Sequence, residues 1–279
     1  MAEPVTWTRL IGSEPSVGQP APAAGPAQGS EKLFSQLGED CLLAIFFDFK
    51  NHGFFIDVGA FDGVYLSNTF AFERLGWSGL CIEAMPEYFD LCVKNRPGST
   101  CVHAACLSVD AGQVELRAER GGLFSGVAAD ENFTASIYRG QHVPFDGFRT
   151  IRVPSASLNG LLAGSTAQID FVSIDVEGAE LEVLSGFDLE RYRPRVLVIE
   201  ANKPEERQAL DLHLGPRGYR LARSLAWNHF YVRSADDMEK LRAIAFAAKL
   251  ERPAHPLGRL YNRVGDAVAP VVRWPAVER

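Results

Sequence analysis

Residues 54–63 read FFIDVGAFDG, and this stretch decides the fold. Its first five residues are apolar apart from one aspartate, which is typical of a strand buried on both faces. Gly59 and Gly63 follow, and glycine lets a backbone turn tightly and approach a ligand closely. Because open α/β sheets bind ligands where their strands end, the stretch predicts a strand, a turn and a binding site in that order.

The sequence on either side of this stretch alternates between strand and helix patterns. Further apolar runs predict strands at residues 79–83, 100–107, 169–174 and 195–200. Helical patterns lie between them, the clearest at residues 36–50, 86–95 and 205–214. Residues 219–224 and 230–232 predict a closing antiparallel hairpin. Such alternation implies a mostly parallel sheet with right-handed crossovers. The sequence therefore predicts a Rossmann-like α/β fold with a seven-stranded, mostly parallel sheet and a C-terminal antiparallel hairpin.

Three segments stand outside this regular pattern. Residues 1–32 are rich in Pro, Ala and Gly, so we expect a flexible leader ahead of one domain at residues 33–234. Residues 119–150 break the alternation and are expected to form an insertion beside the binding site. Residues 235–279 predict an amphipathic helix and a tail, which we expect to serve packing or homo-oligomer formation.

The composition limits the class of protein and its partners. Of 279 residues, 47% are hydrophobic and 23% charged, as in an ordinary soluble globular protein. The formal net charge of −7 argues against nucleic acid as the main partner, because such binders usually carry a basic face. Five cysteines without a CxxC pair or zinc-like spacing predict reduced thiols in a cytoplasmic protein. No signal peptide opens the sequence, and the longest apolar run, residues 41–47, is too short for a transmembrane segment.

The glycine turn also carries two aspartates, Asp57 and Asp62. The GxxxG spacing of Gly59 and Gly63 differs from the GxGxxG fingerprint of dinucleotide-binding turns. Carboxylates repel a pyrophosphate and attract an ammonium or sulfonium group. S-adenosylmethionine (SAM) carries both cations and no phosphate, so the turn favours SAM over a nicotinamide dinucleotide. The alternative is a glycine-rich turn that binds nothing.

Glu83 ends the second predicted strand, twenty residues after Gly63. An acidic side chain at this place can accept hydrogen bonds from both ribose hydroxyls of an adenosine cofactor. A solvent-exposed glutamate in a loop is the alternative. The combination with the preceding glycine turn favours ribose binding.

A second group of carboxylates lies in IDVEGAE, residues 174–180. Asp175 ends a predicted strand, and Glu177 and Glu180 follow closely. Because like charges repel, such crowding indicates a reacting centre, a metal or the SAM ammonium group nearby. Helix N-terminal capping is the alternative, and it accounts for Glu180 but not for Asp175.

The next strand ends at Glu200, with Asn202 two residues later. Together with Asp175, these oxygens lie on adjacent strand ends and would suit Mg²⁺, which lowers the pKa of an acceptor hydroxyl. Lys203 adds a positive charge that would repel such a cation, so we favour a site without metal. His229, near the start of the last strand, is a candidate base, and packing or capping is the alternative for this residue.

Taken together, these motifs resemble the FkbM family of methyltransferases. The matching stretches, spread over about residues 33–233, are SQLGED (35–40), FIDVGAFDG (55–63), WSGLCIEAMPEYF (77–89), NRP (95–97), AAC (104–106), SG (125–126), IDFVSIDVEGAELEVL (169–184) and VLVIEANK (196–203). The resemblance implies a class I methyltransferase fold with SAM as the methyl donor. It also implies O-methylation, usually of sugars, polyketides or related metabolites.

The resemblance extends to single residues. The cofactor-binding set that we carry over comprises Gln36, Asp57, Gly59, Asp62, Ser67, Glu83, Ala105 and Asp175. Asp175 is expected near both SAM and the acceptor, which makes it, with His229, a candidate catalytic residue. Gln36 and Glu39 belong to the SQLGED stretch, which we expect at the methionine end of SAM. Ser173 departs from some relatives, which carry lysine there, so one candidate base is missing.

We therefore expect a SAM-dependent O-methyltransferase that acts on a hydroxyl group of a small molecule or a glycan, with Mg²⁺ dependence left open. Residues 119–150 are expected to cover the acceptor pocket as a lid. Two other functions stay open. One is a non-catalytic partner or regulatory protein with the same fold, and the other is a nicotinamide-dependent oxidoreductase, which the GxxxG turn disfavours.

Overall fold

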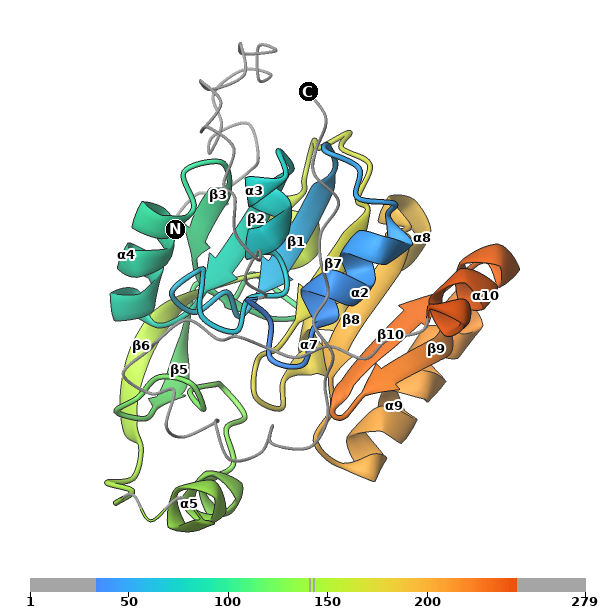
Figure 1. Ribbon diagram of the computed structural model, residues 1–279. Coiled ribbons are helices and arrows are strands. Elements are labelled where there is room, and N and C mark those ends of the chain that lie inside the picture. The colour runs from blue at the N-terminus through green and yellow to red at the C-terminus, as the bar shows by residue number, and fades with distance from the viewer. Residues whose placement is uncertain (1–33, 141, 143, 245–279) are drawn as a thin grey trace, which may run out of the picture.

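The computed structural model describes residues 34–244, except 141 and 143, and its centre is a seven-stranded sheet (Figure 1). The strand order is β3-β2-β1-β7-β8-β10-β9. The strands are β1 (Phe54–Val58), β2 (Ser78–Glu83), β3 (Thr100–His103), β7 (Phe171–Ile174), β8 (Val196–Glu200), β9 (Arg220–Leu225) and β10 (Asn228–Val232). Strand β10 pairs antiparallel with both neighbours, whereas β3, β2, β1, β7 and β8 pair in parallel. The predicted Rossmann-like sheet with its C-terminal hairpin is confirmed.

Helices cover both faces of this sheet. One face carries α2 (Glu39–Phe46), α3 (Phe70–Arg74), α4 (Pro86–Asn95) and α10 (Ala235–Ala243). The other face carries α6 (Leu158–Leu161), α7 (Glu180–Ser185), α8 (Leu189–Tyr192) and α9 (Pro204–Leu214), and a 3₁₀ turn, η1 (Gly215–Arg217), follows α9. Alternate residues of β1 supply the two cores: Ile56 and Val58 pack on one face, and Phe55 packs on the other. This double burial explains why the strands were recognisable as apolar runs.

A second, three-stranded sheet lies beside the first. It has the order β4-β6-β5 and is built from β4 (Ala105–Cys106), β5 (Gln113–Ala118) and β6 (Arg149–Ala156). The single strand predicted at residues 100–107 is therefore wrong, because the chain leaves the large sheet after His103 and β4 pairs with β6 instead.

The segment between β5 and β6 is partly regular. The expectation that residues 119–150 lack regular structure is wrong for one stretch, because Glu131–Gly140 forms the helix α5. This helix places Thr134 and Tyr138 on its buried side, and the exposed remainder is polar, which hid the pattern. Figure 1 shows α5 set apart from the large sheet, beyond β5 and β6.

Two predicted segments fall largely outside the described residues. These are the leader at residues 1–32 and the tail at residues 245–279, so the homo-oligomer prediction for the C-terminal region stays a prediction. Of the helix expected at residues 236–250, the described part is α10, which packs against α2. Within the described ranges, no helix is long and apolar enough to cross a membrane.

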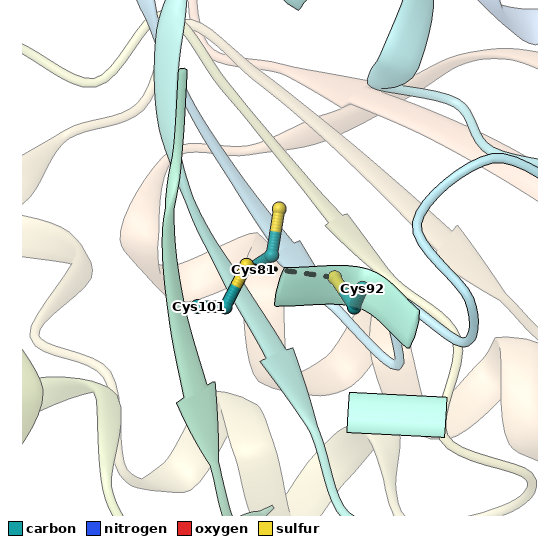
Figure 2. Close-up of side chains that lie close together, drawn as sticks. All are labelled: Cys81, Cys92 and Cys101. Carbon is teal, nitrogen blue, oxygen red and sulfur yellow. Dashed lines mark hydrogen bonds between the residues drawn. The ribbon is translucent and has the colours of Figure 1, made fainter. Parts of the chain in front are cut away.

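All five cysteines are free thiols, as expected from their spacing. Cys41 and Cys106 are buried apart from the others. Cys81, Cys92 and Cys101 come from β2, α4 and β3 and gather in one place (Figure 2). Sequence spacing could not show this gathering, because it depends on strand register and helix packing.

Candidate functional site

A cavity opens where β1, β2, β7 and β8 end, at the edge that parallel α/β sheets use for ligands. Most of the predicted site residues line it, namely Gln36, Asp57, Gly59, Ser67, Glu83, Ala105 and Asp175. Glu177, Glu200 and Asn228 line it as well. Asp62, Asn202 and His229 do not.

The turn after β1 needs glycine at its first position. Gly59 has φ +86°, and a Cβ there would lie 1.8 Å from the backbone oxygen of Asp175. Any other side chain would therefore push the loop after β1 away from the loop after β7. Gly59 keeps Asp57 and Asp175 on neighbouring parts of the cavity wall.

Asp57 is buried and held by a cation that sequence reasoning missed. It accepts a hydrogen bond from Thr69 Oγ1 at 2.5 Å, and the guanidinium of Arg96 lies 3.8 Å away. Burial raises the pKa of Asp57, and the charge of Arg96 opposes this shift. Asp57 thus acts first as an anchor of the loop after β1.

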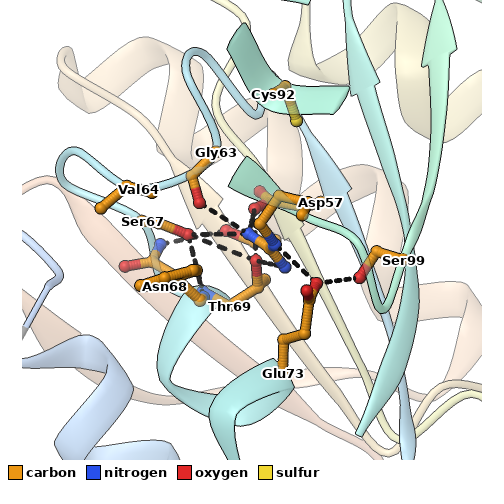
Figure 3. Close-up of polar contacts among 12 residues, drawn as sticks. Asp57, Gly63, Val64, Ser67, Asn68, Thr69, Glu73, Cys92 and Ser99 are labelled. Atoms are coloured by element: carbon orange, nitrogen blue, oxygen red, sulfur yellow. Dashed lines mark hydrogen bonds and ion pairs between the residues drawn. The ribbon is translucent and has the colours of Figure 1, made fainter. Parts of the chain in front are cut away.

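Arg96 joins this loop to its surroundings. Figure 3 shows three of the groups that it contacts, Gly63, Thr69 and Glu73, gathered around one point. Its side chain is fully buried and donates to the Gly63 carbonyl at 2.9 Å and to Thr69 Oγ1 at 2.9 Å. It also forms an ion pair with Glu73 at 2.8 Å. The NRP stretch, quoted above only as part of the family pattern, was the available signal for this residue.

Asp62 stabilises the glycine turn rather than lining the cavity. Its Oδ1 accepts hydrogen bonds from the backbone N–H groups of Val64 at 2.9 Å and Tyr65 at 2.7 Å. Ser67 lies on the cavity wall, and its Oγ accepts from the N–H of Phe70 at 3.0 Å, which supports the start of α3.

Glu83 bridges the loops that follow β1 and β2. Its Oε2 accepts from the N–H of Phe61 at 2.8 Å, and its Oε1 accepts from the N–H of Met85 at 2.7 Å. Burial raises the pKa of Glu83 to about 7, against the lowering effect of these two bonds. Each carboxylate oxygen has a second lone pair, so Glu83 can still accept hydrogen bonds from a ligand in the cavity.

Three carboxyl groups meet at the ends of β7 and β8. Oxygens of Asp175, Glu177 and Glu200 all lie within 4.8 Å of one another. Asp175 is exposed to the cavity, whereas Glu200 is buried and its Oε2 has no hydrogen-bond partner among the described residues. Desolvation by the surrounding protein raises the pKa of Asp175 and of Glu200, and the charge of Asp175 raises that of Glu200 further. The group therefore tends to hold a proton or another cation.

Glu180 belongs to the same sequence stretch but does a different job. Its Oε1 accepts from the N–H groups of Gly178 at 3.0 Å and Val176 at 3.2 Å, in the turn that opens α7. Glu180 therefore stabilises the turn ahead of α7, whereas the helix itself has no side-chain cap, so the capping alternative is not what the structure shows for Glu180. Ser173, at the position where some relatives carry lysine, lines the cavity and accepts from the Asn68 side chain at 3.0 Å.

Two predicted candidates lie away from the cavity. His229 is buried on β10, where its Nδ1 lies 2.8 Å from Ser224 Oγ, and burial lowers its pKa. Its neighbour Asn228 lines the cavity, and successive residues of a strand point to opposite faces. Asn202 is exposed, and its backbone N–H donates to Glu206 at 2.9 Å. Glu177 joins Asp175 and Glu200 in a cluster of carboxylate oxygens, and Asn202 lines a neighbouring hollow together with Glu177 and Glu200.

The SQLGED stretch reaches the cavity from the N-terminal side. Gln36 Oε1 accepts from Trp227 Nε1 at 2.9 Å, and Glu39 Oε1 accepts from the Asn228 amide at 2.7 Å. Both contacts join this stretch to the turn between β9 and β10. The cavity wall thus combines residues from the two ends of the domain.

Part of the insertion between β5 and β6 forms another side of the cavity wall. Gly122, Leu123, Ser125, Gly126 and Val127 line the cavity. Gly126 pairs with Arg117 in an antiparallel bridge, and a Cβ on it would lie 2.8 Å from the Val176 oxygen. The insertion therefore packs tightly against the loop after β7, next to the carboxyl cluster.

The model of the methyltransferase FkbM domain matches residues 57–241. The chain belongs to the FkbM family. It is accordingly a member of a SAM-dependent methyltransferase family. A comparison with curated proteins gives no match.

Solved structures of other methyltransferases are similar to this FkbM chain. A TehB-like SAM-dependent methyltransferase from Corynebacterium glutamicum is 10% identical, with 71% of this chain and 88% of that chain covered and a TM-score of 0.40. A precorrin-6y C5,15-methyltransferase from Geobacter metallireducens is 13% identical, with 69% and 84% covered and a TM-score of 0.38. A protein from Pyrococcus horikoshii, assigned as a candidate RNA methyltransferase, is 12% identical, with 71% and 81% covered and a TM-score of 0.40. The acceptor of this chain has to be inferred from its own cavity.

Proposed function

We propose that this FkbM family member transfers the methyl group of SAM to a hydroxyl oxygen of a small molecule or a glycan. The observation that carries the proposal is the carboxyl cluster of Asp175, Glu177 and Glu200 on the cavity wall. Glu83 ends β2, and Glu200 ends β8, three strand intervals away in the sheet. At about 4.8 Å per interval this separation is roughly 14 Å, which leaves room for SAM and a reacting group between them.

The proposed orientation of SAM follows from the polar groups along this wall. The ribose hydroxyls donate to Glu83, whose oxygens still have free lone pairs. The cationic methionine end lies towards Asp57, Gln36 and Asp175, because carboxylates and amide oxygens attract an ammonium or a sulfonium group. The methyl group then points to the side of the cavity that β7, β8 and the β5–β6 insertion enclose.

The reaction is a displacement at the methyl carbon. A lone pair of the acceptor oxygen forms the new C–O bond, the electrons of the broken C–S bond stay on sulfur, and the hydroxyl proton leaves the acceptor. Alignment of the two reactants supplies much of the rate, and a positioned base supplies the rest. Asp175 is the group that we assign to take the proton, since it is the member of the cluster exposed to the cavity.

A divalent cation at the same cluster is the alternative activation. Three carboxylates are hard oxygen ligands of the type that Mg²⁺ prefers, and a bound cation would make the acceptor hydroxyl more acidic. The positive charge of Lys203, which we expected to oppose a cation, lies against Asp130 at 3.4 Å and Glu206 at 3.3 Å. Lys203 therefore argues only weakly against a metal, and chelation is the deciding measurement.

The charge around the acceptor side supports a non-nucleic acceptor. A second hollow beside the carboxyl cluster is lined by five acidic residues and one lysine, namely Asp130, Glu177, Glu180, Glu200, Glu206 and Lys203. A phosphodiester backbone would be repelled by this surface, whereas a neutral hydroxylated molecule would not.

The experiment is methyl transfer from isotope-labelled SAM to four acceptor classes: hydroxylated small molecules, oligosaccharides, RNA and protein. We expect labelled methyl ethers in the first or second class. With the best acceptor, Asp175→Asn should lower kcat by roughly 100-fold or more while SAM affinity changes little. Transfer to RNA or protein alone would overturn the acceptor assignment. SAM binding without transfer to any class would favour the non-catalytic alternative.

A further inference from the structure

Three thiols converge at a place that the proposed reaction does not use. Cys81 and Cys101 are register partners on the neighbouring strands β2 and β3, and Cys92 faces them from α4 (Figure 2). All three sulfur atoms lie within 4.8 Å of one another, and the Cys92 and Cys101 sulfurs are 3.6 Å apart. Cys81 and Cys92 are fully buried, and Cys101 is half-buried, so the cluster has one accessible corner.

The spacing of these sulfurs matches that of ligands around one ion. Metal–thiolate bonds are about 2.3 Å long, so three sulfurs in a trigonal arrangement lie about 4 Å from one another. The Cys92 and Cys101 sulfurs, 3.6 Å apart, lie close to this value, and no pair of the three is more than 4.8 Å apart. An ion can therefore enter the centre of the triangle through small side-chain movements, without a change in the backbone.

The ligand set selects the class of ion. Among the described residues this group contains thiols alone, without a histidine or a carboxylate. Thiolates prefer soft ions such as copper(I) and zinc, and structural zinc sites almost always have four ligands. We propose that Cys81, Cys92 and Cys101 bind a single copper(I) ion through three thiolates.

The electrostatic surroundings favour a thiolate at Cys101, whereas hydrogen bonding to Cys101 raises the pKa of the Cys81 and Cys92 thiols, which a bound ion would have to deprotonate. Hydrogen bonds from Cys81 and Cys92 lower the pKa of Cys101, and the charge of Arg96 acts in the same direction. Arg96 is fully buried and supplies a positive charge beside a cluster that stays negative after one monovalent ion has bound.

The site touches the wall of the cofactor cavity through the glycine turn. A Cβ on Gly63 would lie 2.7 Å from the Arg96 side chain and 3.2 Å from the Cys92 sulfur. An ion at the three thiols would fasten α4 to β2 and β3 directly beneath this turn. The metal site itself does not depend on the proposed methyl transfer.

The test is a copper(I) titration of the full chain under ascorbate, in competition with the chromophoric chelator bicinchoninate. We expect one bound equivalent. Cys81→Ala, Cys92→Ala and Cys101→Ala should each weaken copper binding by roughly 100-fold, about one ligand's share of a thiolate site. Cys41→Ala and Cys106→Ala are matched controls, because both residues are buried free thiols outside the cluster, and they should bind as wild type does.

A second measurement needs no variant. X-ray absorption at the copper edge of the loaded wild-type chain should show three sulfur neighbours at about 2.3 Å. Nitrogen or oxygen neighbours, or equal losses in the two control variants, would overturn the site. A parallel titration with Zn²⁺ against 4-(2-pyridylazo)resorcinol tests the ion: zinc binding at these thiols without copper binding would overturn the assignment to copper(I).

Discussion

Glu39 accepts a hydrogen bond from the side-chain amide of Asn228 at 2.7 Å, although 189 residues of sequence separate the two. Glu39 is fully buried, and its second carboxylate oxygen accepts from the N–H of Leu37 at 2.7 Å. The contact fixes the SQLGED stretch against the first residue of β10, which lines the cofactor cavity. The N-terminal part of the domain is thus a structural member of the site.

Removal of this carboxyl should destabilise the fold. Glu39→Ala leaves the Asn228 amide and the Leu37 N–H buried without partners, which costs about 1–3 kcal/mol of unfolding free energy. Glu39→Gln keeps one acceptor oxygen and should cost less. Urea unfolding followed by circular dichroism measures both, and equal stability of Glu39→Ala and wild type would contradict the role of this contact.

The same pair predicts a pH dependence. Burial is the largest cause of the raised pKa of Glu39, so the folded state prefers the protonated form. The stability that Glu39 contributes is greatest below its ordinary value of 4.5 and declines as the pH rises towards the raised pKa. Glu39→Gln does not titrate, so its stability relative to wild type should improve between pH 4.5 and pH 8. A pH-independent difference between the two proteins would sink this assignment.

Arg96 should be more important for stability than an ordinary arginine. Arg96→Ala leaves Asp57 and Glu73 without their buried cation, a loss of about 3–5 kcal/mol. Arg120 is the control, because its ion pair with Asp146, 3.5 Å long, joins two exposed side chains and contributes little to stability. Arg120→Ala should therefore unfold as wild type does. Arg96→Lys should recover little of the lost unfolding free energy, because one ammonium group cannot replace the several hydrogen bonds that the planar guanidinium donates. Similar urea midpoints for Arg96→Ala and Arg120→Ala would refute this role.

Glu83 should discriminate ligands by their ribose hydroxyls. Wild type should bind SAM and S-adenosylhomocysteine with micromolar affinity, and both should raise the melting temperature by mass action. Glu83→Ala should weaken SAM binding by roughly tenfold, about the loss of hydrogen bonds to a charged acceptor. An analogue without both ribose hydroxyls should bind wild type and Glu83→Ala alike in calorimetry. A variant that still prefers SAM over this analogue would place the ribose elsewhere.

The segment at residues 119–150 should respond to ligands. Residues 122–123 and 125–127 line the cavity, so S-adenosylhomocysteine should slow amide hydrogen exchange there. Helix α9 lies outside the cavity lining and serves as the internal control. Uniform protection of residues 119–150 that the ligand does not change would contradict the hypothesis that the segment is a lid. The segment would then be an ordered surface insertion.

Chelation separates the two ways to activate the acceptor. If Asp175 takes the proton directly, turnover should persist in EDTA. Loss of turnover in EDTA with recovery in Mg²⁺ would show that the carboxyl cluster works through a cation. Glu177→Gln allows a second test that needs no methyl acceptor. The variant should weaken any Mg²⁺ binding seen by calorimetry and leave SAM binding intact.

The sequence predicted the centre of the large sheet well because β1, β2, β7 and β8 are buried on both faces, so an apolar run was sufficient to find them. The strand-end carboxylates Asp175 and Glu200 followed from the same reasoning. For Glu177, the third member of the cluster, the sequence indicated only that several carboxylates lie close together along the chain. Which of their oxygens meet depends on loop geometry.

Other features depend on three-dimensional packing. His229 was placed at the correct edge, but the alternation of side chains along β10 directs Asn228 to the cavity instead. Arg96 lies at the end of α4 and contacts Gly63 and Glu73, and apart from the NRP stretch of the family pattern no local signal marks a buried guanidinium there. The base role of His229 stays a prediction that its buried place outside the cavity lining does not favour, and the metal role of Asn202 stays a prediction.

The departure of the chain from the large sheet after His103 divides the domain into two parts with separate constraints. The seven-stranded sheet carries Asp57, Glu83 and the other groups proposed to bind the cofactor. The connection between β5 and β6 links two strands of the smaller sheet. Length and sequence can therefore change in that connection while the strand register of the large sheet is preserved. We expect that grafting this one connection between relatives would carry acceptor preference with it.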